Sequence, residues 1–277
     1  MAVALSPTDT AMRSFVHYLP IATTVVAVAF GLVLYRHWRR KPQALYLLWW
    51  MLGVAFYGVG TLTESLTTLF GWHLWTFKAW YISGALLGGA PLAQGTVYLL
   101  MPKRTAHRLT AALLALVSVA ALAVLLSPID YAAVEPYRLS GRVLGWQWVR
   151  AFSPFINVYA FIFLVGGAVW SAWTYRKAGA GKRHRVWGNV LIAIGALLPG
   201  IGGFSARLGY VEVLYVTELI GLTLIWLGYR AIVADTSASV HANQGAGQQQ
   251  PHRLSPAVGG ADCEQRSETG LGSRHRR

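Results

Sequence analysis

Seven apolar stretches, each long enough to cross a bilayer, follow one another between residues 14 and 234 of this 277-residue chain. The hydrocarbon core of a membrane is about 30 Å thick, and about 20 apolar residues in a helix are needed to cross it. Inside lipid the backbone must satisfy its own polar groups, so such stretches are helical. We therefore expect an all-α integral membrane protein with seven transmembrane helices. The predicted spans are Ser14–Tyr35, Ala44–Leu66, Phe77–Leu100, Leu109–Leu126, Phe152–Tyr175, Val186–Ala206 and Val211–Ala234.

Lysine and arginine are distributed unevenly between the two ends of these spans. Cytoplasmic loops of multi-pass proteins carry an excess of both residues. This asymmetry predicts an external N-terminus and a cytoplasmic C-terminus. The net charge of +14 is then mostly a topology signal, and we do not expect nucleic-acid binding. The loops after the first, third and fifth spans contain Arg36, Arg39, Arg40, Lys41, Lys103, Arg104, Arg108, Arg176, Lys177, Lys182, Arg183 and Arg185, whereas the opposite end has Arg13, Lys78, Arg138, Arg142, Arg150 and Arg207.

Composition divides the chain into three parts. Residues 1–13 form a short external segment, and residues 14–234 form the membrane domain. From residue 235 the chain is rich in Ser, Ala, Gly, Gln, His and Arg, a composition that buries too little apolar surface to offset chain entropy. We therefore expect 235–277 to be a disordered cytoplasmic tail. The long loop at 127–150 is predicted to be external and to fold onto the outer surface.

A glycine spacing recurs in the second and sixth spans. Gly53, Gly58 and Gly60 have the same spacing as Gly195, Gly200 and Gly202. This pattern suggests a 3+1+3 parallel repeat, with the fourth helix as connector, an arrangement that some transporters use. Because the chain contains 29 glycines, a chance match is the competing explanation.

Polar residues within the spans are the main functional clue, because a charge in the bilayer rarely persists without a partner or a purpose. The candidates among them fall in the predicted outer half of the membrane. One interpretation is an outward-facing polar pocket that binds a ligand. The alternative is that two ion pairs, Glu64–Lys78 and Glu218–Arg207, join neighbouring helices without any ligand. The candidate ligand-binding residues are Glu64, Lys78, Tyr81, Asn157, Arg207 and Glu218.

Several chemistries have no suitable residues in this sequence. The chain has one cysteine, Cys263 in the predicted tail, so no thiolate metal site is expected. No aspartate lies within a span, which excludes an aspartyl intramembrane protease, and no P-loop, His-Glu-x-x-His or Gly-x-Ser-x-Gly motif occurs. No histidine is placed at mid-membrane to hold haem. We expect no cofactor, no metal and no catalytic residues, and we favour a function other than catalysis.

Three segments carry a resemblance to known proteins. They are Gly60-Thr61-Leu62-Thr63-Glu64, Trp80-Tyr81-Ile82-Ser83-Gly84 and Gly95-Thr96-Val97-Tyr98-Leu99-Leu100. With them, residues 14–234 resemble a family of uncharacterised seven-helix membrane proteins from bacteria, and more loosely the seven-helix sensor modules of bacterial histidine kinases. The resemblance implies the fold and a sensing role. A microbial rhodopsin is excluded because the last span has no lysine for a retinal Schiff base.

Two functional hypotheses follow from this sequence. The first is a multi-pass protein of the cell membrane that binds or translocates a small solute through the outward-facing pocket. The second is a non-enzymatic receptor or accessory subunit, in which the basic loops or the tail engage a cytoplasmic partner protein. Membrane lipid is an expected partner in both.

Overall fold

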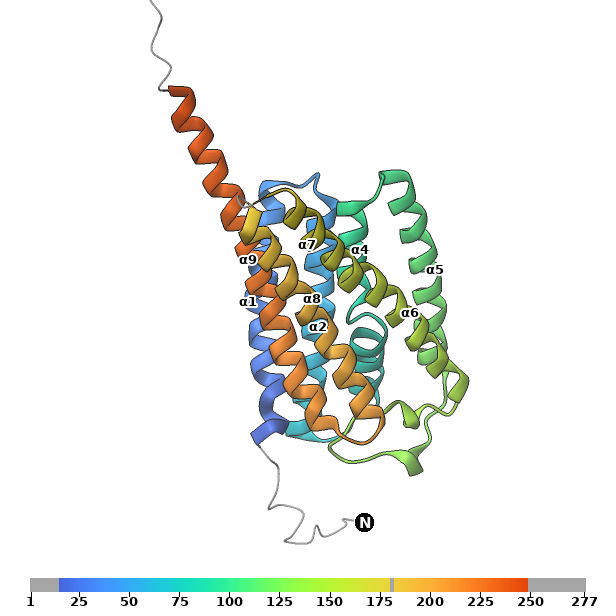
Figure 1. The fold of residues 1–277 in the computed structure, drawn as a ribbon. Helices are drawn as coiled ribbons and strands as arrows, with labels where there is room; N and C mark the ends of the chain where they lie inside the picture. Colours follow the sequence, from blue (N-terminus) through green and yellow to red (C-terminus); the bar gives the residue numbers. More distant parts are fainter. Residues whose placement is uncertain (1–14, 180–181, 249–277) are drawn as a thin grey trace, which may run out of the picture. The chain divides into compact units, whose positions relative to one another are not determined.

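The structure, a computed structural model, describes residues 15–179 and 182–248, and side chains are described as far as residue 234. Every named element in these residues is helical (Figure 1). The chain divides into two units, Met1–Ser237 and Ala238–Arg277. The helices are α1 (Leu19–Arg40), α2 (Leu45–Phe70), α3 (Leu74–Trp80), α4 (Ala90–Leu100), α5 (Lys103–Leu126), α6 (Phe152–Ala160), α7 (Gly167–Lys177), α8 (Arg183–Arg207) and α9 (Val211–Gln248).

The ends of the predicted domain layout fall partly outside this description. The external segment at 1–13 and residues 249–277 of the predicted tail lie outside the described residues. Within the predicted tail, the backbone of 235–248 is helical as the last part of α9. Disorder in 249–277 stays a prediction.

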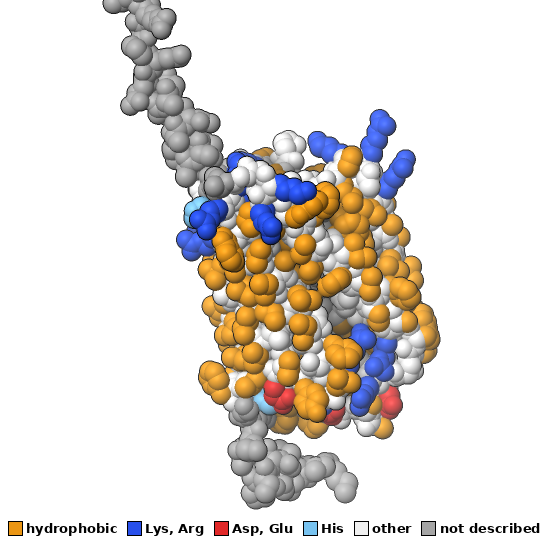
Figure 2. Space-filling model, viewed as in Figure 1, with side chains coloured by type: hydrophobic (Ala, Val, Ile, Leu, Met, Phe, Trp, Pro, Cys, Tyr) orange, Lys and Arg blue, Asp and Glu red, His pale blue; other side chains and the backbone are white. Residues whose placement is uncertain are grey.

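Six helices of the described chain are long and apolar enough to cross a membrane. Hydrophobic side chains cover the middle of the face shown in Figure 2; lysines and arginines gather at the top of this view, and a second group of them lies at the lower right. Val25, Leu122 and Ile162, on three different helices, are each more than half exposed. Such a surface fits a multi-pass integral membrane protein, because lipid replaces water around the apolar side chains. The six helices are Phe15–Arg40, Leu45–Phe70, Lys103–Leu126, Gln147–Lys177, Arg183–Arg207 and Val211–Ala234.

The third predicted span is not one α-helix, which corrects the expectation of a single helix over Phe77–Leu100. Helix α3 continues into a π-helical turn, Tyr81–Leu86, and the helix then stops before α4 begins at Ala90. Gly88 and Gly89 occupy the break, and Pro91 lies in the first turn of α4. Glycine disfavours a helix interior, and proline is best tolerated in the first turn of a helix. The count of seven spans, their orientation and the 3+1+3 repeat stay predictions.

Two apolar clusters hold the membrane domain together. The first lies among α1, α2, α4 and α9 and includes Phe30, Leu34, Val54 and Leu222. The second joins α3 and α5 to the loop between α5 and α6: Leu139, Val143, Leu144 and Val149 are buried in it beside Phe77 and Val124. The loop is therefore packed on the bundle. We call the end that carries this loop, 127–151, the loop end, and the opposite end the basic end.

Glycines bring α8 and α9 into backbone contact. A Cβ atom on Gly195 would lie 2.6 Å from the carbonyl oxygen of Gly221, and one on Gly221 would lie 2.6 Å from the carbonyl oxygen of Gly195. Gly188 and Gly228 form a second such pair nearer the basic end. Small residues at a helix interface are the usual means by which helices associate in lipid.

Gln94 ties three helices together inside the bundle. It is fully buried on α4, and its amide nitrogen donates to Ala106 O at 3.2 Å and to the Thr110 hydroxyl at 2.7 Å, both on α5. Its amide oxygen accepts the hydroxyl of Tyr159 on α6. The side chain thus satisfies donors and acceptors that no water can reach in lipid.

Replacing Gln94 with leucine is expected to lower the free energy of unfolding by about 2 kcal/mol, because the groups of Tyr159 and Thr110 lose a buried partner. The thermal melting curve of the detergent-solubilised protein measures the change. Gln43→Leu is the control, since Gln43 is exposed between α1 and α2. Equal melting temperatures for the two variants would contradict the assigned role of Gln94.

Candidate functional site

The part of α2 nearest the loop end is polar but buried. Thr63, Ser65 and Thr67 all donate their hydroxyls to carbonyl oxygens three or four residues earlier in the same helix. These side chains are therefore satisfied within α2. Glu64 has no partner of this kind, although only 4% of its surface is exposed. Its carboxyl group is the one on this segment that must find partners on other helices.

A close approach of two glycines brings one partner to Glu64. A Cβ atom on Gly60 would lie 3.1 Å from the Cα of Gly84 in the π-helical turn. Glu64 lies one helical turn after Gly60, and Trp80 lies one turn before Gly84. The indole Nε1–H of Trp80 donates to Glu64 Oε1 at 2.9 Å. The indole thereby satisfies one oxygen of the carboxyl group and leaves the other to be accounted for.

Glu218 of α9 lies against the same carboxyl group. The hydroxyl of Tyr57 on α2 donates to the backbone oxygen of Glu218 at 3.1 Å and so holds α9 beside α2. The carboxyl groups of Glu64 and Glu218 are within hydrogen-bonding range of each other. We call these two residues the carboxyl pair.

Two carboxyl groups so close together in a buried position favour one shared proton. Oε2 of Glu64 and Oε2 of Glu218 are both buried, and no hydroxyl, amide, indole or basic group among the described residues donates to either. An ionised carboxylate only accepts hydrogen bonds, so a bond between two carboxyl groups exists only when one of them is protonated. Two adjacent negative charges in a buried site also repel each other strongly. With one proton the pair carries a net charge of −1.

An open pocket lies between the carboxyl pair and the surface of the loop end. Its volume is about 300 Å³. Thr68 lies one helical turn beyond Glu64, and Tyr215 lies one turn before Glu218, so these two lining residues lie between the pair and the loop end. We call it the outer pocket, because the predicted orientation places the loop end outside the membrane. It is lined by His17, Thr68, Glu135, Pro136, Tyr137, Arg138, Gly209, Val211, Glu212 and Tyr215.

The rim of the outer pocket contains both ion pairs found among the described residues. Arg138 lies 3.4 Å from Glu135 within the loop, and His17 lies 3.7 Å from Glu212 between the start of α1 and the start of α9. The His17 ring also meets the Tyr215 ring edge-on, with centroids 6.1 Å apart. When His17 is neutral, the rim and the carboxyl pair together carry net negative charge.

The remaining predicted site residues lie elsewhere. Lys78 is buried, and its ammonium donates to Leu125 O at 2.6 Å, where it caps the C-terminus of α5. Tyr81 is packed under the loop at Gly141, and Asn157 donates to Ala85 O at 3.4 Å. Arg207 is exposed at the end of α8. The structure thus brings Glu64 and Glu218 together and places these four apart from them.

The predicted ion pairs Glu64–Lys78 and Glu218–Arg207 are wrong for the described structure. Lys78 is directed to the end of α5 instead, because exposed carbonyls at a helix C-terminus attract a cation. Glu64 binds an indole and Glu218 faces Glu64. Glu64 and Glu218 therefore have no basic partner among the described residues.

Several residues of the site were not identified from the sequence. Tyr215 shares a helix face with Glu218, and Thr68 shares one with Glu64. Helical spacing could therefore have identified both residues from the sequence. The loop that contains Glu135 and Arg138 was predicted to fold onto the outer surface, but its sequence does not indicate which of its residues reach a pocket. No group of three or more His, Cys, Asp or Glu side chains in the described part of the chain is arranged to hold a metal ion.

The chain matches no protein-family model, no curated protein and no solved structure. Function is therefore inferred from the geometry of the outer pocket and the carboxyl pair.

Proposed function

We propose that this membrane protein binds a small cationic solute in the outer pocket, held by the charge of the carboxyl pair. The observation that carries the proposal is the meeting of Glu64 and Glu218, from α2 and α9, beneath an open pocket. Each keeps a buried oxygen that no protein donor reaches. Neither glutamate is among the residues that line the pocket, so the pair acts on a solute there through its charge.

Charge and size favour a small cation or amine. The net negative charge of rim and pair attracts positive charge, and the nearby rings of Tyr215 and His17 add faces on which a cation can rest. A pocket volume of about 300 Å³ is at the lower end of the range for small-molecule sites. An anion or a bulky solute does not fit this arrangement.

The interior beyond the pair favours binding over free passage. Val54, Leu222, Phe30 and Ile225 fill the bundle between the carboxyl pair and the basic end. Translocation requires these side chains to move apart. A receptor in the cell membrane, which binds the solute and engages a partner through the basic loops, needs no such opening and is the second candidate. The resemblance to sensor modules agrees with that candidate.

A thermal-shift experiment on the detergent-solubilised full-length protein tests the proposal. Ammonium, choline and putrescine are the probes, with acetate and glucose as charge controls. Binding to the folded state raises the melting temperature by linkage, so at least one cation should stabilise wild type while acetate and glucose do not. Glu218→Gln should weaken this binding by about 30-fold or more, because only one of the two carboxyl groups is then left to carry negative charge opposite the bound cation.

Asp130→Asn is the matched control, because Asp130 is an exposed loop carboxylate outside the outer pocket. This variant should keep the full response to the cation. If Asp130→Asn and Glu218→Gln respond alike, or if no cation stabilises wild type, the proposal is wrong. Uptake of the binding cation into proteoliposomes would then separate a transporter from a receptor.

A further inference from the structure

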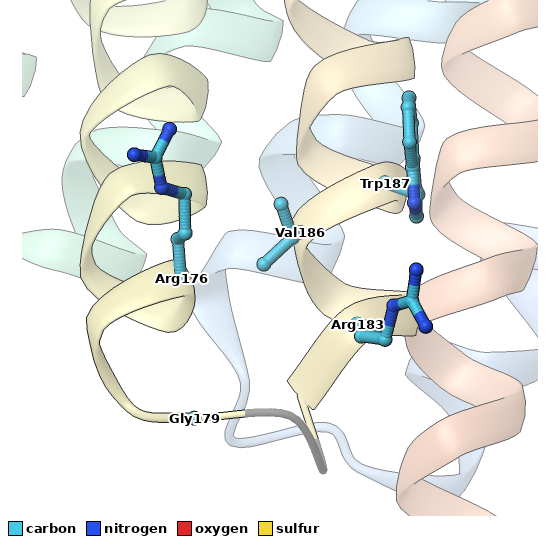
Figure 3. Close-up of a pocket in the computed structure, with 5 residues that line it drawn as sticks. All are labelled: Arg176, Gly179, Arg183, Val186 and Trp187. Atoms are coloured by element: carbon cyan, nitrogen blue, oxygen red, sulfur yellow. The ribbon is translucent and has the colours of Figure 1, made fainter.

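A second pocket lies at the basic end, between the end of α7 and the start of α8. It has a volume of about 380 Å³ and is lined by Arg176, Gly179, Arg183, Val186 and Trp187. Figure 3 shows Arg176 on α7 and Arg183 on α8, on either side of Val186. We call it the inner pocket. It is separate from the outer pocket and does not depend on the function proposed for that site.

The two arginines of the inner pocket have no acidic partner among the described side chains. No aspartate or glutamate occurs between residues 136 and 211. The described carboxylates are Glu64 and Glu218 of the pair and three residues at the loop end, namely Asp130, Glu135 and Glu212. Neither Arg176 nor Arg183 takes part in an ion pair of the described structure. The exposed guanidinium groups of Arg176 and Arg183, which lie on opposite sides of Val186 in Figure 3, are therefore available to an anion from outside this part of the chain.

The apolar part of the inner pocket indicates where that anion comes from. Trp187 is 62% exposed, and Trp170 and Trp173 are also exposed on α7. The ammonium of Lys177 lies 3.6 Å from the centroid of the Trp173 ring. Exposed tryptophans beside basic residues at the ends of membrane helices lie at the level of the lipid headgroups. The inner pocket therefore opens toward headgroups, with Val186 and Trp187 suited to an acyl-chain or glycerol contact.

We propose that the inner pocket binds the phosphate of an anionic phospholipid. Arg176 and Arg183 hold the phosphate oxygens, since guanidinium groups match phosphate in geometry and charge. Val186 and Trp187 contact the apolar part of the same lipid. Basic pockets between membrane helices on the cytoplasmic side are a known setting for such headgroups.

Native mass spectrometry of the full-length protein in detergent tests this proposal. The probes are phosphatidylglycerol and phosphatidylcholine with identical acyl chains. Wild type should bind phosphatidylglycerol more tightly than phosphatidylcholine. Arg176→Gln combined with Arg183→Gln should weaken phosphatidylglycerol binding roughly tenfold. Both side chains are exposed, so the variant should fold, and an unchanged melting temperature verifies that it does.

The control is Arg104→Gln combined with Arg108→Gln, which removes the same charge from exposed positions of α5 at the same end. It should leave the affinity for phosphatidylglycerol unchanged. An equal loss in both double variants would assign the effect to general electrostatics and overturn the site. Equal binding of phosphatidylcholine would also overturn it. Displacement of the lipid by an equal concentration of inorganic phosphate would mean that the site serves a soluble phosphate instead.

Discussion

Replacing Gly195 with leucine is expected to prevent the membrane domain from folding. A Cβ atom there would lie 2.6 Å from Gly221 O and 2.9 Å from Ile225 N, both backbone atoms of α9. A backbone cannot rotate away as a flexible side chain can, so α8 and α9 must separate. We expect a loss of about 4 kcal/mol or more, which is at the severe end of single substitutions.

Gly200→Leu on the same helix is the matched control. No atom lies within 4 Å of a Cβ placed on Gly200, and this residue is exposed. Size-exclusion profiles and melting curves in detergent measure both variants. We expect a monodisperse, wild-type-like Gly200→Leu protein and little or no folded Gly195→Leu protein. A Gly195→Leu protein that melts like wild type would show that α8 and α9 are not in backbone contact.

Binding of a cation is expected to displace the proton held by the carboxyl pair. Wild type should then release up to about one proton for each cation bound. Acidification supplies the competing proton, so affinity for the cation falls as pH falls. The double variant Glu64→Gln, Glu218→Gln has no carboxyl group at the pair, so it should release no proton and bind about 100-fold more weakly at neutral pH.

Isothermal titration with the most stabilising of ammonium, choline and putrescine measures the released protons. Titrations in phosphate and in Tris, which have different ionisation enthalpies, give the number of protons from the difference in heat. Glu135→Gln retains the pair but changes the rim, so it should keep proton release with altered affinity. Cation binding by wild type without proton release at any pH would contradict the shared proton.

The sequence was sufficient for most of the helices because hydrophobic length is a strong signal in membrane proteins. The break at Gly88 and Gly89 was missed because apolar length says nothing of continuity. Pro91, two residues after Gly89, is of a type that often occurs in the first turn of a helix, and it was the local signal for the start of α4. Helix ends and breaks depend on local backbone chemistry that a hydropathy pattern averages out.

Glu64 and Glu218 were selected from the sequence because charges are rare inside lipid. Their meeting could not be derived, since it depends on Gly60 contacting Gly84 and on Tyr57 holding α9. From the sequence we instead considered pairs of opposite charge, Glu64 with Lys78 and Glu218 with Arg207. Coulomb attraction alone does not decide such pairs: a helix C-terminus with exposed carbonyls competed successfully for Lys78.

The interrupted third segment also bears on the order in which the chain assembles. No described backbone donor reaches the carbonyl oxygen of Ala85, just before the break. It accepts instead from Ser153 at 3.0 Å and Asn157 at 3.4 Å, both on α6. During synthesis these side chains emerge well after α3 and α4, and lipid offers no substitute donor. The carbonyl oxygen of Ala85 is therefore satisfied only when α6 is packed against the third segment, so the N-terminal half of the bundle depends on its C-terminal half.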